Sequence, residues 1–366
     1  MLERKPHKNM LENDSILISI KVSSALILAF LFGFIILFLT GHNPVEAYGS
    51  LLQGAFGSKW GFGETLISTV PLIFCSLGFI LAFRCGLFNM GLEGQIALGG
   101  IVAAYLGYSI HGLPPVIHIT ICIIGAAIAG GLWGYGPGIL KARFGIHEVI
   151  GTIMMNYIAY DISAYMVSTN GPMKDRLTEM PASPFIQNSA KMVRIWKGTR
   201  LHWGIFLAVA MSVVVWFILF RTRLGYKLRA VGKNQFAAEA AGINIPKYIT
   251  LTMTLSGVFG GIAGGVQILG LHYRLFAAFS PGYGWDAIAV GLLGLLHPYG
   301  ILAASFLFGV LRSGSILMQA VAGVSKDMIS VITGVIIFFL GMTDPVGNFI
   351  KNKISRKEYG NVSKDT

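Results

Sequence analysis

The chain has 366 residues, of which 54% are hydrophobic and 12% are charged, and its mean hydropathy is +0.68. A soluble domain carries about 25% charged residues, so the composition excludes an ordinary soluble domain and indicates a membrane protein. The formal net charge of +12 predicts no nucleic-acid partner, because the basic residues gather beside apolar segments, where they orient a chain in the bilayer.

Ten apolar segments follow one another along the chain, and a transmembrane helix needs about 20 predominantly apolar residues. Two of the segments, 96–110 and 287–296, are shorter, and we expect them to be broken or re-entrant. The sequence therefore predicts an all-α, polytopic integral membrane protein with about ten transmembrane helices. The segments are approximately Ile16–Thr40, Leu66–Phe83, Ile96–Ile110, Val116–Leu140, Ile150–Val167, Trp203–Phe220, Ile249–Leu271, Ala287–Leu296, Ile301–Ala320 and Met328–Met342.

The basic residues between Arg221 and Lys247 predict the orientation of the chain. The positive-inside rule places this cluster in the cytoplasm, and both termini then lie inside as well. Segment Ile16–Thr40 is too long for the apolar part of a signal peptide and has no small-residue cleavage site after it, so we expect a retained first span. The expected parts are a cytoplasmic N-terminus at 1–15, a transmembrane domain at 16–346 with an external loop at 170–200 and a cytoplasmic segment at 221–248, and a cytoplasmic tail at 347–366.

Glycines recur at every fourth residue in two of the segments. Small residues at this spacing let helix backbones approach closely, since lipid supplies no hydrophobic drive for helix association. We expect tight packing inside the bundle; the alternative is that these helices slide during transport. The two series are Gly130, Gly134 and Gly138, and Gly257, Gly261 and Gly265.

The stretch "FRCGLFNMGLEGQIALGG" (Phe83–Gly100) places five glycines and several polar side chains among apolar spans. Each glycine costs a regular helix about 1 kcal/mol, so we expect a break. Unwound backbone at membrane depth survives only where it is buried in protein or lines a water-filled cavity. Phe279–Gly300 is also glycine-interrupted, and two broken segments in corresponding halves indicate a substrate path.

Polar residues in these stretches are the candidates for that path. Asn89 and Glu93, with Gln95 beside them, either orient a polar solute or hydrogen-bond the freed backbone and hold the break. Arg84 anchors the topology or pairs with Glu93; the alternative is that it contacts substrate. Asn156 is a further path candidate, although scaffold hydrogen bonding is the expected role for it and for Asp161.

Asp286 lies in the second broken stretch, and Arg312 is a basic residue in the middle of an apolar segment. A charge in such a position needs a partner. We therefore predict an Asp286–Arg312 ion pair, with Asp286 also a candidate for substrate contact.

No pattern indicates catalysis or a metal site. Cys75, Cys85 and Cys122 lie in or beside apolar spans without metal-ligand spacing, and we expect them to pack. The chain lacks the phosphate-binding sequence Gly-x-x-x-x-Gly-Lys-Ser/Thr, because Lys227 stands where its first glycine would be and Asn234 where the hydroxyl would be. We expect no enzyme, no metal and no cofactor on this chain. A membrane enzyme is the alternative class, and the missing constellations argue against it.

Five motifs occur in an order that resembles the permease subunits of bacterial ABC importers, a family that serves ribose-type sugars and branched-chain amino acids. The resemblance covers nearly the whole chain, and its second motif is most similar to the nucleoside-importing branch. The motifs are "NPVEAYGSLLQGAFGS", "FRCGLFNMGLEGQ", "LKARFGIHEVIGTIMMNYIA", "AVGKNQFAAEAAGI" and "GYGWDAIAVGLLG" with the "ILAASFLFGVLRSGS" that follows it.

The resemblance implies a permease subunit in the bacterial plasma membrane that moves nucleosides into the cell. Ribose-type sugars are the alternative substrates, and an ion-coupled secondary carrier is the alternative mechanism. The implied partners are ABC ATPase subunits, which bind the ATP and Mg²⁺, a second permease subunit that is a different paralogue, and an extracytoplasmic substrate-binding lipoprotein.

By the same resemblance, Gly232–Ile243 contains the coupling helix, which fits a cleft on the ATPase subunit. A short helix with a face of small side chains suits docking into a groove; the alternative is a solvated loop. Many relatives place proline after the asparagine, whereas this chain has Gln235. The expected coupling residues are Asn234, Ala238, Glu239, Ala241 and Gly242, and the small-residue face also includes Ala237.

Overall fold

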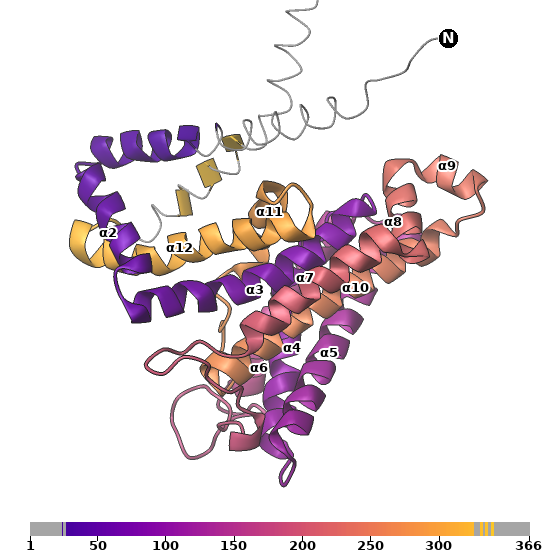
Figure 1. Cartoon of the computed structure of the whole chain (residues 1–366). Coiled ribbons are helices and arrows are strands. Elements are labelled where there is room, and N and C mark those ends of the chain that lie inside the picture. Colours follow the sequence, from indigo (N-terminus) through magenta and orange to yellow (C-terminus); the bar gives the residue numbers. More distant parts are fainter. Residues whose placement is uncertain (1–23, 25–26, 326–329, 332–333, 336–337, 340–366) are drawn as a thin grey trace, which may run out of the picture. The chain divides into compact units, whose positions relative to one another are not determined.

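The computed structural model describes residues 24, 27–325, 330–331, 334–335 and 338–339. Regular structure in these residues is helical apart from isolated β-bridges, which confirms the all-α class. The chain divides into two units, one formed by residues 51–314 and the other by 1–50 with 315–366. In chain order (Figure 1) the helices are α2 (Pro44–Phe56), α3 (Lys59–Arg84), α4 (Leu92–Ser109), α5 (Pro115–Phe144), α6 (Glu148–Val167), η1 (Asn188–Ala190), α7 (Gly204–Arg221), α8 (Arg223–Lys233), α9 (Gln235–Ala240), α10 (Ile245–Gln267), the π-helical turn η2 (Ile268–His272), α11 (Tyr283–Leu293) and α12 (Pro298–Ala322).

Helices that are long and apolar enough to cross a bilayer account for much of the chain. In the described part there are five: α3, α5, α7, α12, and α10 together with η2. Shorter apolar helices form at Ile27–Leu39 and in α11. A polytopic membrane protein is therefore confirmed, but a count of about ten spans is not.

The remaining predicted segments explain why the structure describes fewer long apolar helices than the ten predicted spans. Segments 96–110 and 150–167 form α4 and α6, which are helical but are not among the five long apolar helices. Segment 328–342 falls mostly outside the described residues, as do the predicted termini 1–15 and 347–366.

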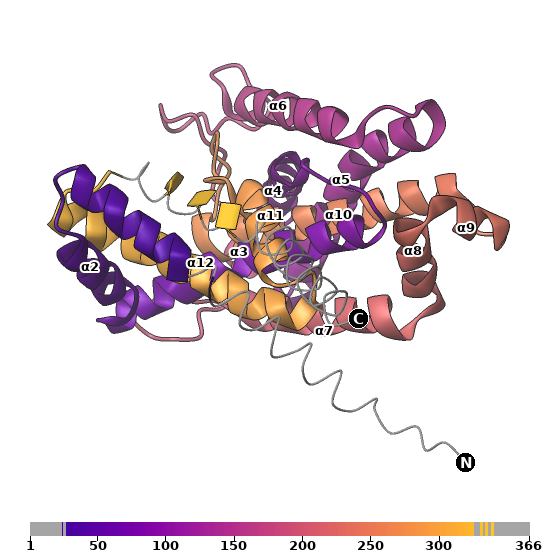
Figure 2. The same ribbon diagram turned by 90° about the horizontal axis from the view of Figure 1, so that it is seen from above.

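The larger unit is built around α10, which packs against α5, α4 and α3. The predicted glycine contact is confirmed between α5 and α10, because a Cβ on Gly257 would meet the carbonyl oxygen of Gly130, and one on Gly261 would meet the backbone of Ala126 and Gly130. Helix α6 lies on the outer side of α4 and α5, and α8 and α9 lie together at one end of α10 (Figures 1 and 2).

The loop between α6 and α7, predicted at 170–200, is held in place by backbone pairing with the chain after α10. Ser183 N donates to Leu275 O at 2.8 Å, Ile186 N to Tyr273 O at 2.9 Å, and Met192 N to Leu269 O at 2.9 Å. Arg200 also forms a 2.5 Å ion pair with Glu64 of α3. The loop is therefore an ordered layer over one end of the larger unit.

In the smaller unit, the helix Ile27–Leu39 packs against the start of α2. Tyr48 donates its hydroxyl hydrogen to Phe30 O at 3.0 Å, and the two rings meet edge to face at 5.8 Å. Helix α2 was not among the predicted elements, although Asn43 caps it by accepting from Val45 N at 3.1 Å and Pro44 is its first residue.

Candidate functional site

The first predicted break is confirmed and is shorter than the stretch that suggested it. Helix α3 ends at Arg84 and α4 begins at Leu92, so Cys85–Gly91 is the interruption. The glycines after it belong to a regular helix, where they permit close packing: a Cβ on Gly99 would meet the backbone of Gly261. A Cβ on Gly94 would meet Asn156 and Ala159 of α6, and one on Gly100 the ring of Phe279, so these glycines reflect close packing and not unwinding.

A buried amide network holds this break. Asn89 Nδ2 donates to Ser256 Oγ at 2.7 Å and to Gln95 Oε1 at 3.2 Å, and Asn89 Oδ1 accepts from Gly91 N at 2.9 Å. Asn89 and Gln95 are almost fully buried. The structure thus brings these two predicted residues together with α10, around backbone that the break leaves without helical partners.

Asn156 performs the same task from α6. Its Nδ2 donates to Met90 O and its Oδ1 accepts from Gly94 N, both at 2.8 Å. The expected scaffold role of Asn156 is confirmed in this conformation. Asp161 lies exposed on the same helix, and the scaffold role expected for it stays a prediction.

The second broken stretch contains the half-length helix α11. Its 11 residues span about 16 Å, against the roughly 30 Å of a hydrocarbon core. It begins after Gly282, at φ +94°, and is followed by Leu295 and Leu296, both at φ +55°. These left-handed residues stop the helix, and the predicted short, broken segment is confirmed.

Glu93 binds the beginning of α11. Its carboxylate, 1% exposed, accepts from Gly284 N at 2.5 Å and from Gly282 N at 3.2 Å. These N–H groups have no partner within α11, and a carboxylate at a helix N-terminus is also favoured by the helix dipole. The side chain therefore caps a helix remote from it in sequence.

Arg84 binds the other end of α11. Its Nη2 and Nε donate to Leu296 O at 2.8 and 3.2 Å, three residues beyond the last helical position. The hypothesis that Arg84 pairs with Glu93 is wrong, because each side chain is engaged by a different end of the same short helix. A cation at the C-terminal end and an anion at the N-terminal end both match the helix dipole.

Asp286 and Arg312 form the predicted ion pair. Arg312 Nη2 lies 2.7 Å from Asp286 Oδ2, Arg312 also donates to Pro281 O at 3.0 Å, and its guanidinium lies 4.4 Å from the centre of the Tyr283 ring. The two charged side chains are 23% and 24% exposed. Helix α12 is thereby attached to the first turn of α11 by an ion pair that the chain buries only in part.

The predicted coupling segment forms the end of α8 and the short helix α9. Asn234 caps α9 by accepting from Ala237 N at 3.0 Å, and Gly242 follows it at φ +77°. The glycine is required because an L side chain rarely adopts this conformation. The expected short helix is confirmed, and its N-cap by Asn234 is a finding of the structure.

The exposed face of α9 differs from the expected one. Ala238 is only 3% exposed and packs in a cluster with Leu87 and Leu228, whereas Ala237, Glu239 and Ala241 are exposed. Ala238 is therefore a core residue. The sequence analysis missed Phe236, which is 85% exposed; the available signal was that it is the one aromatic residue of Gly232–Ile243.

The coupling segment lies directly against the first break. A Cβ on Gly86 would lie 3.3 Å from Gly232 Cα, and one on Gly232 would meet the backbone of Arg84 and Cys85. The apolar cluster around Ala238 also includes Cys85 and Leu87. A displacement of α8 and α9 would thus act on the residues that carry Arg84.

Comparison with known proteins agrees with this arrangement. Residues 61–341 match the family described as branched-chain amino acid transport system, permease component. The guanosine ABC transporter permease protein of Bacillus subtilis is 38% identical over 91% of this chain and 95% of its own length. The nucleoside ABC transporter permease protein of Lactococcus lactis is 34% identical, over 87% and 89% of the two chains. A glucose ABC transporter permease protein of Haloferax volcanii is 30% identical, over 81% and 80%. The chain therefore belongs to this family and is a multi-pass permease subunit of an ABC transporter.

Proposed function

We propose that this permease carries nucleosides into a bacterial cell as one subunit of an ATP-driven importer. The observation that carries the substrate class is that relatives 38% and 34% identical over most of this chain are named for guanosine and for nucleosides. Ribose-type sugars are the second candidate, favoured by the glucose permease relative at 30% identity. Both candidates present sugar hydroxyls, which carboxylate, amide and guanidinium groups can bind.

The proposed mechanism is alternating access driven from α9. ATP and Mg²⁺ bind to the two ATPase subunits, and the closure of these subunits onto each other moves α9 and α8. Close contact between Gly232 and Gly86 transmits the motion to the first break. Arg84 and Glu93 then carry it to the two ends of α11. No covalent chemistry takes place on this chain.

The proposed solute path passes the beginning of α11. Asp286 is partly exposed there, whereas Asn89, Glu93, Gln95 and Asn156 are buried in this conformation. A movement of α11 away from α4 would expose Glu93 to the path. Asn89, Gln95 and Asn156 would then border it and keep the break in shape, so both roles considered for these residues belong to one cycle.

The proposed partners follow from the two ends of the molecule. Phe236, Glu239, Ala241 and Gly242 dock into an ATPase subunit at the cytoplasmic side, with Asn234 shaping the helix. The 170–200 loop faces outward, toward a substrate-binding lipoprotein. A second permease, a different paralogue, completes the transmembrane part, and both termini lie in the cytoplasm of a bacterium with the chain in its plasma membrane.

The test is uptake of radiolabelled guanosine by cells that lack their own nucleoside importers and express the chain with its ATPase, second permease and lipoprotein. We expect ATP-dependent uptake that unlabelled nucleosides inhibit and ribose does not. Inhibition by ribose, with none by nucleosides, would show that the substrate is a ribose-type sugar and not a nucleoside. Uptake by the chain alone, driven by an ion gradient, would instead support a secondary carrier.

A further inference from the structure

A cavity of about 460 Å³ lies between α5 and α10, next to the end of each helix that carries basic residues. Its lining residues include the apolar Ile139 and Leu251 and the polar Tyr135, Arg143 and Lys247. Arg143 belongs to the last turn of α5 and Lys247 to the first turn of α10. By the positive-inside rule, this end of the two spans is at the cytoplasmic surface of the membrane.

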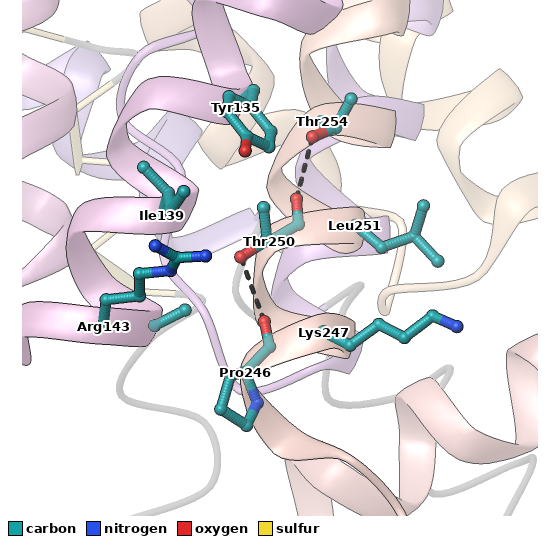
Figure 3. Close-up of a pocket in the computed structure, with 9 residues that line it drawn as sticks. Tyr135, Ile139, Arg143, Pro246, Lys247, Thr250, Leu251 and Thr254 are labelled. Atoms are coloured by element: carbon teal, nitrogen blue, oxygen red, sulfur yellow. Dashed lines mark hydrogen bonds between the residues drawn. The ribbon is translucent and has the colours of Figure 1, made fainter.

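The two cations of the cavity have no anionic partner among the described residues. Nearby Lys141, in contrast, forms a 2.9 Å ion pair with Glu148. Figure 3 shows the guanidinium of Arg143 directed toward Thr250 and the ammonium of Lys247 on the other side of α10. The hydroxyl of Thr250 donates to Pro246 O at 3.0 Å, so Arg143 provides the cavity's principal free donors. The positive end of the α10 dipole adds to its attraction for an anion.

An apolar stripe on α5 leads away from this cavity. Leu132, Tyr135, Ile139 and Arg143 follow one another at helical spacing on one face of α5, and Leu132 is 66% exposed. From Leu132 to Arg143 the helix rises about 17 Å, close to the ~15 Å of one leaflet's hydrocarbon. Exposed Phe144 lies just beyond Arg143, as suits a side chain at the membrane interface.

We propose that this cavity binds an anionic phospholipid of the inner leaflet. Arg143 binds the headgroup phosphate through two parallel N–H···O bonds, and an acyl chain lies along Ile139 and Leu132. Charge complementarity selects the occupant, because basic pockets between helix ends on the cytoplasmic side suit anionic headgroups. The lipid would fill the space between α5 and α10, the two helices whose glycines are in contact.

Native mass spectrometry of the purified full-length chain in detergent tests the proposal. The probes are dioleoyl phosphatidylglycerol, the zwitterionic dioleoyl phosphatidylcholine, and inorganic phosphate as a competitor. We expect phosphatidylglycerol adducts to exceed phosphatidylcholine adducts, and Arg143→Ala to lower phosphatidylglycerol binding about fivefold. Ile139→Trp, which fills the apolar side without changing charge, should also reduce binding.

Arg223→Ala is the matched control, since Arg223 is exposed at the same end of the molecule but outside the cavity. Only variants whose melting temperature and size-exclusion elution volume match those of the unmodified chain are compared. A loss of lipid binding then cannot result from a loss of fold. Equal binding of the two lipids, or an equal loss in Arg223→Ala, would overturn the proposal. Displacement of the lipid by inorganic phosphate would identify free phosphate as the ligand and also overturn it. Unchanged phosphatidylglycerol binding in Arg143→Ala would also overturn it.

Discussion

Glu93 and Arg84 bind opposite ends of the same half-length helix. The carboxylate accepts from Gly284 N at the beginning of α11, and the guanidinium donates to Leu296 O just beyond its end. Both residues flank the Cys85–Gly91 break. One interrupted helix thereby positions the other, and each charge compensates the backbone groups that the short helix leaves unpaired.

Replacing the charge at the beginning of α11 tests this relationship. Glu93→Gln keeps the shape of the side chain but removes the anion, and hydrogen bonds to a charged group contribute ~1.5–3 kcal/mol. We expect the free energy of unfolding to fall by about 2 kcal/mol, measured by thermal unfolding in detergent, together with a loss of uptake. Glu46→Gln is the control, because Glu46 is exposed on α2. Equal effects of the two substitutions would contradict the capping role.

At the other end of α11, Arg84→Lys retains a charge but cannot place two donors on one carbonyl as the guanidinium does. We expect transport to fall in Arg84→Lys and to be lost in Arg84→Met, with normal amounts of protein in the membrane by immunoblot. If Arg84 were only an orientation anchor, Arg84→Lys would transport like the unmodified chain.

Much of this site could be predicted from local sequence. The break follows from glycines and polar residues between apolar spans, and the Asp286–Arg312 pair follows from the cost of a lone charge at membrane depth. The close contact of α5 and α10 follows from glycines at every fourth position. Each of these predictions depends on a property of the side chains themselves.

The partner of Glu93 could not be predicted in the same way. It is a backbone N–H at Gly284, 191 positions along the chain, and a backbone donor has no identity in the sequence. The inward orientation of Ala238 was missed for a related reason, because α9 has only six residues and its buried side is set by α8 and the first break.

The Asp286–Arg312 pair should couple α11 to α12. In a double-mutant cycle with Asp286→Asn and Arg312→Gln, we expect the double variant to be more stable than the sum of the single effects predicts. Contacting residues in such cycles show coupling of ~0.5–3 kcal/mol, and the partial exposure of this pair places it toward the lower end. Strictly additive losses in thermal unfolding would show that the pair contributes nothing.

Two neighbouring positions on α9 should behave in opposite ways. Phe236→Ala removes an exposed ring and should lower co-purification of the ATPase subunit without changing the thermal stability of the chain. Ala238→Leu adds volume inside the apolar cluster and should cost ~1–3 kcal/mol of stability. The reverse pattern, a stability loss at 236 and an ATPase loss alone at 238, would be inconsistent with the observed face of α9.

Because of the α5–α10 contact, we expect alanine substitutions at two glycines to differ sharply in their effect on folding. Gly261→Ala places a Cβ against the backbone of Ala126, which cannot move as a side chain does, so we expect poor folding and low membrane levels. A Cβ on Gly151 of α6 meets nothing within 4 Å, and Gly151→Ala should be neutral or stabilising by up to ~1 kcal/mol. Fluorescence-detected size-exclusion chromatography of both variants provides the measurement.

In the proposed transport cycle, ATPase motion is transmitted through α9 and the first break and opens a water-filled route at the beginning of α11. Ser280 lies two residues before Gly282, next to the beginning of α11. The deciding measurement is the labelling rate of Ser280→Cys by a water-soluble thiol reagent in the assembled transporter, with Cys75, Cys85 and Cys122 replaced by serine. We predict that ATP binding changes this rate by at least about tenfold, since a minor state is populated at ~10% or less, and that Phe236→Ala abolishes the change. Equal labelling rates with and without ATP would contradict the account.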